Sequence, residues 1–156
     1  MQENRKRPRI MVDMSATLIH HGHVRLLEKA ALLGDVVVAL TSDEEVRKTK
    51  GYEPELNFEE RKEILMAFRT VKEVVSCPWM IDDAFMDAQR CDFLVHGADN
   101  SNHVRKDRLV IFPRTEGVSS TMLRERVLRA VIEQKKVGKG NSATRLLDGY
   151  VNGDLA

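Results

Sequence analysis

The sequence has 156 residues, and its 25 lysines and arginines balance 24 aspartates and glutamates to leave a formal net charge of +1. This balance excludes a global attraction to nucleic acid or to a membrane surface. Two cysteines are too few for a disulfide scaffold, no apolar stretch reaches the ~20 residues that span a bilayer, and no signal peptide opens the chain. We expect one cytoplasmic domain over residues 1–156, without nucleic-acid binding or membrane insertion.

Strands and helices are predicted to alternate along the chain. After a basic tail at 1–9, the core begins with a strand at 10–14 and a helix at 24–33. Further strands are predicted at 35–40, 74–76, 92–97 and 109–113, and further helices at 43–48, 58–68, 81–89 and 119–133. This alternation predicts an α/β fold, a Rossmann-like open parallel sheet of about five strands with helices on both faces. The core should end near residue 135, and 138–156 form a C-terminal extension.

The loops that follow the predicted strands hold the unusual residues of the sequence. In open α/β sheets, ligands bind outside the carboxyl ends of the strands. The loops expected at that edge cover residues 15–23, 41–57, 97–108 and 113–120. We therefore expect the functional site at this edge.

A histidine-rich turn follows the first predicted strand. Its sequence, SATLIHHGH, has neither the G-x-G-x-x-G fingerprint nor the Walker lysine pattern. Gly22 permits close approach of the backbone to a ligand, and the helix that follows offers free N–H groups to an anion. His20 and His23 are three residues apart and can face the same side. We rank catalysis first for this pair, a structural role second and zinc binding third, because no further metal ligand lies nearby in sequence.

Five segments in register resemble one enzyme superfamily. His20-His21-Gly22-His23 resembles the H-x-G-H signature of the nucleotidyltransferases, in their small cytidylyltransferase branch. Residues 43–51 resemble the lysine loop of these enzymes, and 58–61 (FEER) resemble their E-E-R segment. CDFLVHGAD (91–99) is similar to ethanolamine-phosphate cytidylyltransferases, and RTEGVSST (114–121) resembles a signature shared with the glycerol- and choline-phosphate enzymes.

One segment departs from the family pattern. Before the histidines the family writes G-x-F-D, whereas this chain has Met14 for the glycine, Ala16 for the phenylalanine and Thr17 for the aspartate. This change is the main argument for a relative that binds a nucleotide without turning it over.

The resemblance implies transfer of CMP from CTP to a small phosphorylated alcohol or phosphonate, with release of pyrophosphate. It implies catalytic roles for His20, His23, Lys48 and Arg114. It further implies nucleotide binding by Thr17, Gly22, Arg61, Gly97, Asp99, Ser119, Ser120 and Thr121, and acceptor binding by Lys50 and Trp79. Several of these residues have an ordinary alternative: solvated lysines, a solvated surface arginine at Arg61, a core tryptophan, an Asp99 that only shapes its turn, and serines that only cap a helix.

The resemblance also implies partners. Mg²⁺ is expected with CTP, without a metal centre held by the protein, and the protein is expected to form a homodimer. An adenylyltransferase that uses ATP and a non-catalytic nucleotide-binding relative stay open as alternatives. The identity of the acceptor depends on a few pocket side chains and is left open.

Overall fold

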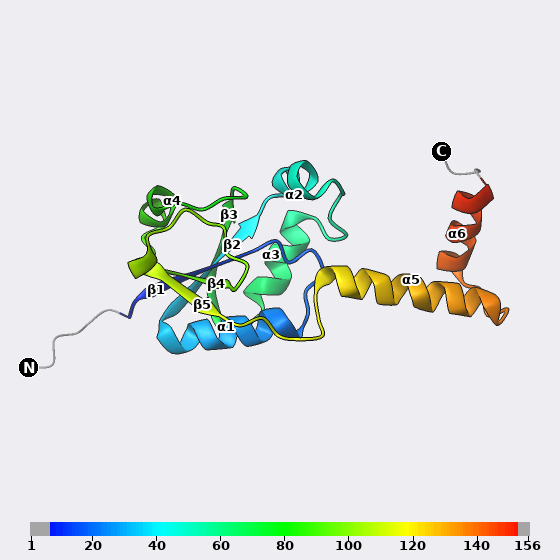
Figure 1. Cartoon of the computed structure of the whole chain (residues 1–156), viewed down its shortest axis with the longest axis horizontal. Helices are drawn as coiled ribbons and strands as arrows, with labels where there is room; N and C mark the ends of the chain where they lie inside the picture. Colours follow the sequence, from blue (N-terminus) through cyan, green and yellow to red (C-terminus); the bar gives the residue numbers. More distant parts are fainter. Residues whose placement is uncertain (1–6, 153–156) are drawn as a thin grey trace, which may run out of the picture. The chain divides into compact units, whose positions relative to one another are not determined.

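The computed structural model describes residues 7–152, and its centre is a five-stranded parallel sheet (Figure 1). The strands are β1 (Arg9–Met14), β2 (Asp35–Thr41), β3 (Val71–Cys77), β4 (Phe93–Gly97) and β5 (Leu109–Phe112). They lie in the order β3-β2-β1-β4-β5, and every pairing is parallel. The predicted Rossmann-like sheet of about five strands is confirmed.

The helices that connect the strands are α1 (His21–Leu33), α2 (Asp43–Lys50), α3 (Phe58–Met66) and α4 (Asp83–Ala88), and a 3₁₀ turn, η1 (Lys106–Arg108), precedes β5. The described residues form two compact units, up to Val118 and from Ser119 onward. The second unit contains α5 (Ser120–Lys136) and α6 (Ser142–Asn152).

Helices cover both faces of the sheet, as the sequence predicts. On one face Leu27 of α1 and Leu65 of α3 pack on strand residues such as Val38. On the other face Met86 of α4 packs with Val37 of β2. Figure 1 shows α1 and α4 on opposite sides of the sheet. Successive β2 side chains are buried on both faces, which explains its unbroken apolar run.

Two expected boundaries were wrong. Arg9 is not part of a basic tail, because it is the first residue of β1 and its guanidinium donates to Glu73 at 2.8 Å. Residues 1–6 of that expected tail lie outside the described part of the chain. β3 begins at Val71 rather than residue 74. It is an edge strand, and its exposed Lys72 and Glu73 interrupt the run of apolar residues from which the strand was predicted.

The second unit is helical. α5 buries none of its residues fully, and Ser119 caps its N-terminus by accepting a hydrogen bond from the Met122 N–H at 3.1 Å. The expected C-terminal extension contains α6, and Lys135 of α5 pairs with Asp148 of α6. Within residues 7–152, no helix combines the length and the apolar character that crossing a bilayer requires.

Candidate active site

The site lies where the strand order reverses. β1 has β2 on one side and β4 on the other. Helix α1 connects β1 to β2 on one face of the sheet, and α4 connects β3 to β4 on the other face. A crevice at the carboxyl ends of such strands is the usual ligand position in this fold class. The histidine turn follows β1, α2 follows β2, the Gly97–Asp99 turn follows β4, and Arg114 follows β5.

The two histidines cap the helix that they precede. His20 is the N-cap of α1, and its Nδ1 accepts a hydrogen bond from the Gly22 N–H at 3.1 Å. The Nδ1 of His23 in turn accepts from the His20 backbone N–H at 3.2 Å. This reciprocal pair is a capping box in which imidazoles replace the usual serine and glutamate. It stacks the two rings at a tilt of 35° with their centroids 3.9 Å apart.

This capping fixes the tautomer of both rings. Because each Nδ1 accepts a hydrogen bond, the proton of each neutral imidazole resides on Nε2. Burial is the main cause that lowers the pKa of His23 to about 3, and the pKa of His20 is lowered by the same cause. The rings are therefore neutral at pH 7, and each carries an Nε2–H that no capping bond uses. They are hydrogen-bond donors rather than cations.

The lowered pKa values predict a loss of stability in acid. Below about pH 6.5 the unfolded chain takes up protons on both imidazoles, whereas folded His23 stays neutral down to about pH 3. The free energy of unfolding should fall as the pH drops through this window, by at most about 1.4 kcal/mol per pH unit for His23. Urea unfolding at several pH values measures the slope. His23→Gln keeps a capping acceptor and should flatten it, so equal slopes would contradict this origin.

Gly22 allows the two rings to stack. A Cβ at this position would lie 2.9 Å from Cε1 and Nδ1 of His20 and 3.3 Å from Cγ1 of Val118. Alanine would suit the helix backbone but would displace the His20 ring.

We expect Gly22→Ala to fold and to lose about 10²-fold in kcat, because a displacement of about 1 Å at a reacting group has that effect. Turnover measurements give kcat, and thermal melting shows whether the variant is folded. His21→Ala, a change at an exposed neighbour on the same turn, is the matched control and should keep both. A Gly22→Ala variant with full turnover would show that the ring position is unimportant.

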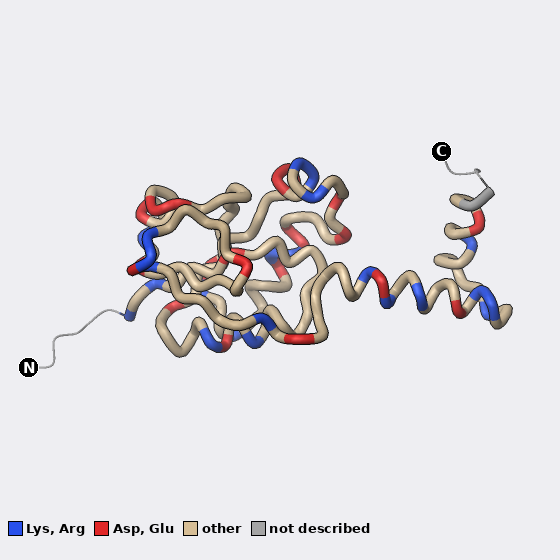
Figure 2. Tube along the Cα trace, in the orientation of Figure 1, with Lys and Arg blue, Asp and Glu red and all other residues tan. Residues whose placement is uncertain are grey.

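Of the two predicted lysines, the structure brings Lys50 toward the histidines. The charge of Lys50 contributes to the lowered pKa of His23, and its Nζ lies 5.7 Å from the centre of the Trp79 ring. Lys48 and Lys50 are both exposed on α2. The acidic first turn and basic last turn of α2, visible as red and blue segments in Figure 2, match the helix dipole and present Lys50 at the C-terminal end. Trp79 is half-buried at the same edge of the sheet.

Arg114 and the turn after β4 meet beside the histidines. The charge of Arg114 lowers the pKa of both His20 and His23. Its guanidinium is exposed and lies 3.4 Å from Asp99. A Cβ on Gly97 would lie 2.9 Å from Oδ1 of Asp99, so a side chain at this position would displace the Asp99 carboxylate. Arg114, Gly97 and Asp99 are thus brought together as the sequence predicts.

Arg61 is buried, which excludes the alternative of a solvated surface arginine, and nucleotide binding by Arg61 stays a prediction. Its side chain is 0% exposed. The guanidinium donates to the backbone oxygens of Ser15 at 2.5 Å, Thr41 at 3.0 Å and Leu56 at 3.1 Å, and to Oδ1 of Asp43 at 2.5 Å. These acceptors lie in the loops after β1 and β2. Arg61 therefore joins the histidine loop to the lysine helix, and its donors are engaged by protein rather than open to a nucleotide.

A buried polar group next to the histidine loop was missed by sequence reasoning. Asp13, the penultimate residue of β1, accepts from Asn102 Nδ2 at 2.8 Å, and the same oxygen lies 3.4 Å from Nε2 of His96. Its other oxygen, Oδ1, is buried and has no hydrogen-bond partner within the described residues. A carboxylate inside an apolar strand was the available signal, because ionised residues are seldom buried without a partner.

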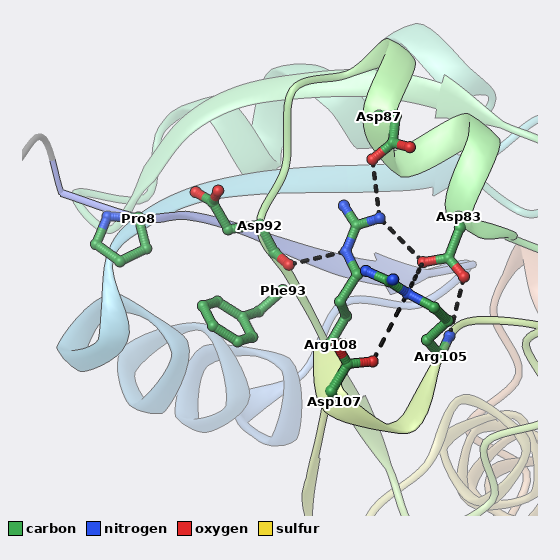
Figure 3. A pocket seen from close by; sticks show the side chains of 8 residues that line it. All are labelled: Pro8, Asp83, Asp87, Asp92, Phe93, Arg105, Asp107 and Arg108. Atoms are coloured by element: carbon green, nitrogen blue, oxygen red, sulfur yellow. Dashed lines mark hydrogen bonds and ion pairs between the residues drawn. The ribbon is translucent and has the colours of Figure 1, made fainter.

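The hollow lined by Arg108 is not the candidate site. It lies around the amino ends of β4 and β5, which is the opposite edge of the sheet from the histidines, and measures about 700 Å³. Figure 3 shows Arg108 directed at Asp83 and Asp87, with ion-pair distances of 2.9 and 2.8 Å. Its remaining donors contact the backbone oxygens of Cys91 and Asp92. This cluster ties α4 to η1.

Comparison with known proteins decides the family. A family model described as cytidylyltransferase-like matches residues 15–126. The chain belongs to the cytidylyltransferase-like family. The resemblance read from its motifs is thereby confirmed, and the expected enzyme class, nucleotidyltransferase, is that of the named relatives.

Three relatives illustrate the range of the family. Ethanolamine-phosphate cytidylyltransferase of Dictyostelium discoideum is 36% identical over 137 residues, which cover 80% of this chain and 38% of that protein. Glycerol-3-phosphate cytidylyltransferase of Bacillus subtilis is 35% identical, with 70% of this chain and 89% of that protein covered. FAD synthase of Thermococcus kodakarensis is 33% identical, with 80% and 83% covered. The chain spans about two fifths of the length of the Dictyostelium and Arabidopsis ethanolamine-phosphate enzymes.

A solved structure agrees on the fold. The lipopolysaccharide core biosynthesis protein from Thermoplasma volcanium superposes with a TM-score of 0.59 at 18% identity, over 70% of this chain and 98% of that chain. At this identity the likeness concerns the fold alone.

The turn that departs from the cytidylyltransferase family pattern is compact and strained. Ala16 has a φ of 46°, in the left-handed region that side chains other than glycine seldom adopt. Thr17 is buried, and its hydroxyl lies 3.5 Å from that of Tyr52. Thr17 is therefore a buried residue of the histidine turn, and its contact with a nucleotide stays a prediction.

The serine and threonine residues of the last signature lie in the second unit. Ser119 caps α5, and Ser120 and Thr121 form its first turn. Capping accounts for Ser119 by itself. A phosphate cradle made by the three hydroxyls stays a prediction.

Proposed function

We propose that this protein transfers CMP from CTP to a small acceptor bearing a phosphate or phosphonate, with phosphoethanolamine as the favoured acceptor. The observation that carries the proposal is the pair of stacked, neutral imidazoles whose Nε2–H groups remain available beside a helix N-terminus. Two donors of fixed tautomer in such a position suit a phosphate whose charge increases in a transition state.

The reaction needs alignment and charge neutralisation more than a strong base. An oxygen of the acceptor, already anionic at neutral pH, attacks the α-phosphorus of CTP. The new P–O bond forms as the bond to the β-phosphate breaks, and pyrophosphate leaves with the electron pair. In this scheme His20 and His23 donate to oxygens of the reacting phosphates. Lys48, Lys50 and Arg114 neutralise the charge of the phosphates.

Mg²⁺ would accompany the triphosphate in this proposal. Within residues 7–152, no group of three or more His, Cys, Asp or Glu side chains is arranged to hold a metal ion. A cation held mainly by phosphate oxygens fits this donor set, as is usual for nucleotide-bound Mg²⁺. The residues of this chain would then contact the phosphates rather than the metal.

The choice of acceptor rests on Asp13. Its Oδ1 is a buried oxygen without a hydrogen-bond partner in the described chain, at the carboxyl end of β1. An ammonium group would satisfy it, whereas a neutral glycerol would supply only a hydroxyl. The similarity to ethanolamine-phosphate cytidylyltransferases supports the same choice.

One experiment tests nucleotide and acceptor together. Pyrophosphate release is measured with CTP or ATP against phosphoethanolamine, phosphocholine, glycerol phosphate and 2-hydroxyethylphosphonate. We expect turnover with CTP and the highest kcat/KM for phosphoethanolamine. Turnover with ATP alone would overturn the proposal, and nucleotide binding without turnover would favour a non-catalytic relative.

An ATP-dependent reaction is the second candidate. FAD synthase of Thermococcus kodakarensis shares 33% identity over 83% of its own length, which is the observation in its favour. Flavin mononucleotide with ATP therefore belongs in the same panel. A cytoplasmic homodimer completes the proposal, and light scattering that gives the mass of a monomer would remove the dimer.

A further inference from the structure

Asp13 and His96 face each other across adjacent parallel strands. Asp13 lies on β1 and His96 on β4, and their side chains are 12% and 20% exposed. Oδ2 of Asp13 is 3.4 Å from Nε2 of His96 and also accepts from Asn102 at 2.8 Å. Both residues lie at the carboxyl edge of the sheet, and β1, which carries Asp13, leads into the histidine turn.

The hydrogen bond between His96 and Gly97 favours a proton between His96 and Asp13. Its Nδ1 lies 2.9 Å from the backbone oxygen of Gly97, which can only accept, so Nδ1 is the donor there. A neutral ring would then present the lone pair of Nε2 to a carboxylate oxygen. Two acceptors facing each other in a shielded place are unfavourable. One extra proton, held between the imidazole and the carboxylate, removes this conflict.

The surrounding groups favour retention of that proton. Burial raises the pKa of Asp13 and outweighs His96 and Asn102, which lower it, and the negative charge of Asp99 in the turn after β4 adds a smaller increase. Asp99 Oδ1 also lies 3.8 Å from Nδ1 of His96. From β3, the Cys77 thiol has a pKa raised by burial, by Asp13 and by Glu45 of α2, so it stays neutral. Among the described residues, His96 is the basic side chain paired with Asp13.

We propose that Asp13 and His96 share one exchangeable proton in the free enzyme, and that the ammonium group of the acceptor replaces it on binding. The inference rests on the proposed phosphoethanolamine acceptor and adds a role for His96. The ammonium approaches the unpartnered Oδ1 of Asp13. A positive charge on His96 beside it would then be repulsive, so the Nε2 proton leaves to solvent. No covalent bond between heavy atoms changes.

His96 is thus a positioning residue that acts through Asp13. It compensates the charge of the buried Asp13 carboxylate while the site is empty. A bound cationic acceptor then provides this compensation instead. A neutral acceptor such as glycerol phosphate brings no charge to replace the proton. The pair therefore selects for a cationic acceptor and makes its binding dependent on pH, because the ammonium and the proton compete.

The test is the pH dependence of KM for phosphoethanolamine at saturating CTP and Mg²⁺. In the wild type KM should rise toward acid with a slope approaching about tenfold per pH unit, in excess of the titration of the substrate itself. His96→Gln cannot hold the proton. Its KM should therefore follow only the titration of the substrate and lack the extra slope. KM for CTP should be alike in both proteins. Calorimetry in buffers of different ionisation enthalpy should count about one more proton released by the wild type.

The outcomes separate this inference from the function on which it rests. Turnover of phosphoethanolamine with coincident pH profiles for wild type and His96→Gln would overturn the shared proton and leave the proposed function intact. Turnover restricted to glycerol phosphate would overturn the acceptor, and the proton exchange with it. If His96→Gln does not fold, Asp13→Asn replaces it and should raise KM for phosphoethanolamine without the extra slope. If neither variant folds, a calorimetric count of no released proton in the wild type would overturn the inference.

Discussion

Replacing His20 by asparagine is expected to leave the fold intact and to lower kcat by about 10²–10³-fold. The Oδ1 of asparagine can accept the hydrogen bond that Nδ1 of His20 accepts from Gly22, and asparagine is among the best N-cap residues. It has no group at the position of Nε2, so the donor to the reacting phosphate is lost. Removal of one such donor has an effect of this size in other enzymes.

The comparison with alanine makes the test specific. His20→Ala removes both the cap and the donor, so it should lose similar activity and also about 1 kcal/mol of stability. Steady-state kinetics and urea unfolding on the three proteins give both quantities. An asparagine variant with wild-type kcat would show that His20 only caps α1. Loss of stability in the asparagine variant equal to that of alanine would show that the cap was misassigned.

Replacing Arg61 by methionine is expected to give the largest loss of stability, about 3–5 kcal/mol. Methionine fills much of the same volume but leaves Asp43 and the backbone oxygens of Ser15, Thr41 and Leu56 without their donor. Removing the buried partner of a charged pair has effects of this order, because the other charge, here the half-buried carboxylate of Asp43, loses its compensation. For a protein of ordinary stability this is a large fraction of the total.

Lysine at position 61 is the matched control. It retains the charge but cannot reach the same set of acceptors, because its ammonium is a point donor rather than a planar fork. We expect an intermediate stability, together with a reduced kcat, since the histidine loop and α2 would no longer be joined. Urea unfolding measures the stability of the variant, and turnover measurements give its kcat. Equal stability of the wild type and the methionine variant would contradict the assigned role.

The sheet could be predicted from sequence patterns because each central strand contains a continuous run of apolar residues. The run DVVVAL is apolar at every position after the first, as a strand buried on both faces must be. β3 was placed too late because an edge strand exposes polar side chains, and Arg9 was misread because charge alone does not distinguish a tail from the start of a strand.

The site was predicted where a motif is contiguous and missed where partners come together only in space. His20, Gly22 and His23 act within four residues, so their pattern is visible in sequence. The acceptors of Arg61 lie up to 46 residues away, and Asp13 is 89 residues from Asn102. Burial of such groups follows from packing that no short window of sequence contains. The neutral state of the histidines has the same origin, since burial lowers their pKa.

Because the same two imidazoles hold the first turn of α1 and face the proposed nucleotide, a descendant that abandoned turnover would not be free to accept any residue there. Its helix would still need one acceptor at the N-cap and another at the third helical position. Substitutions at positions 20 and 23 should therefore favour asparagine, serine, glutamine or glutamate. Apolar residues should be rare there even in relatives that have lost turnover.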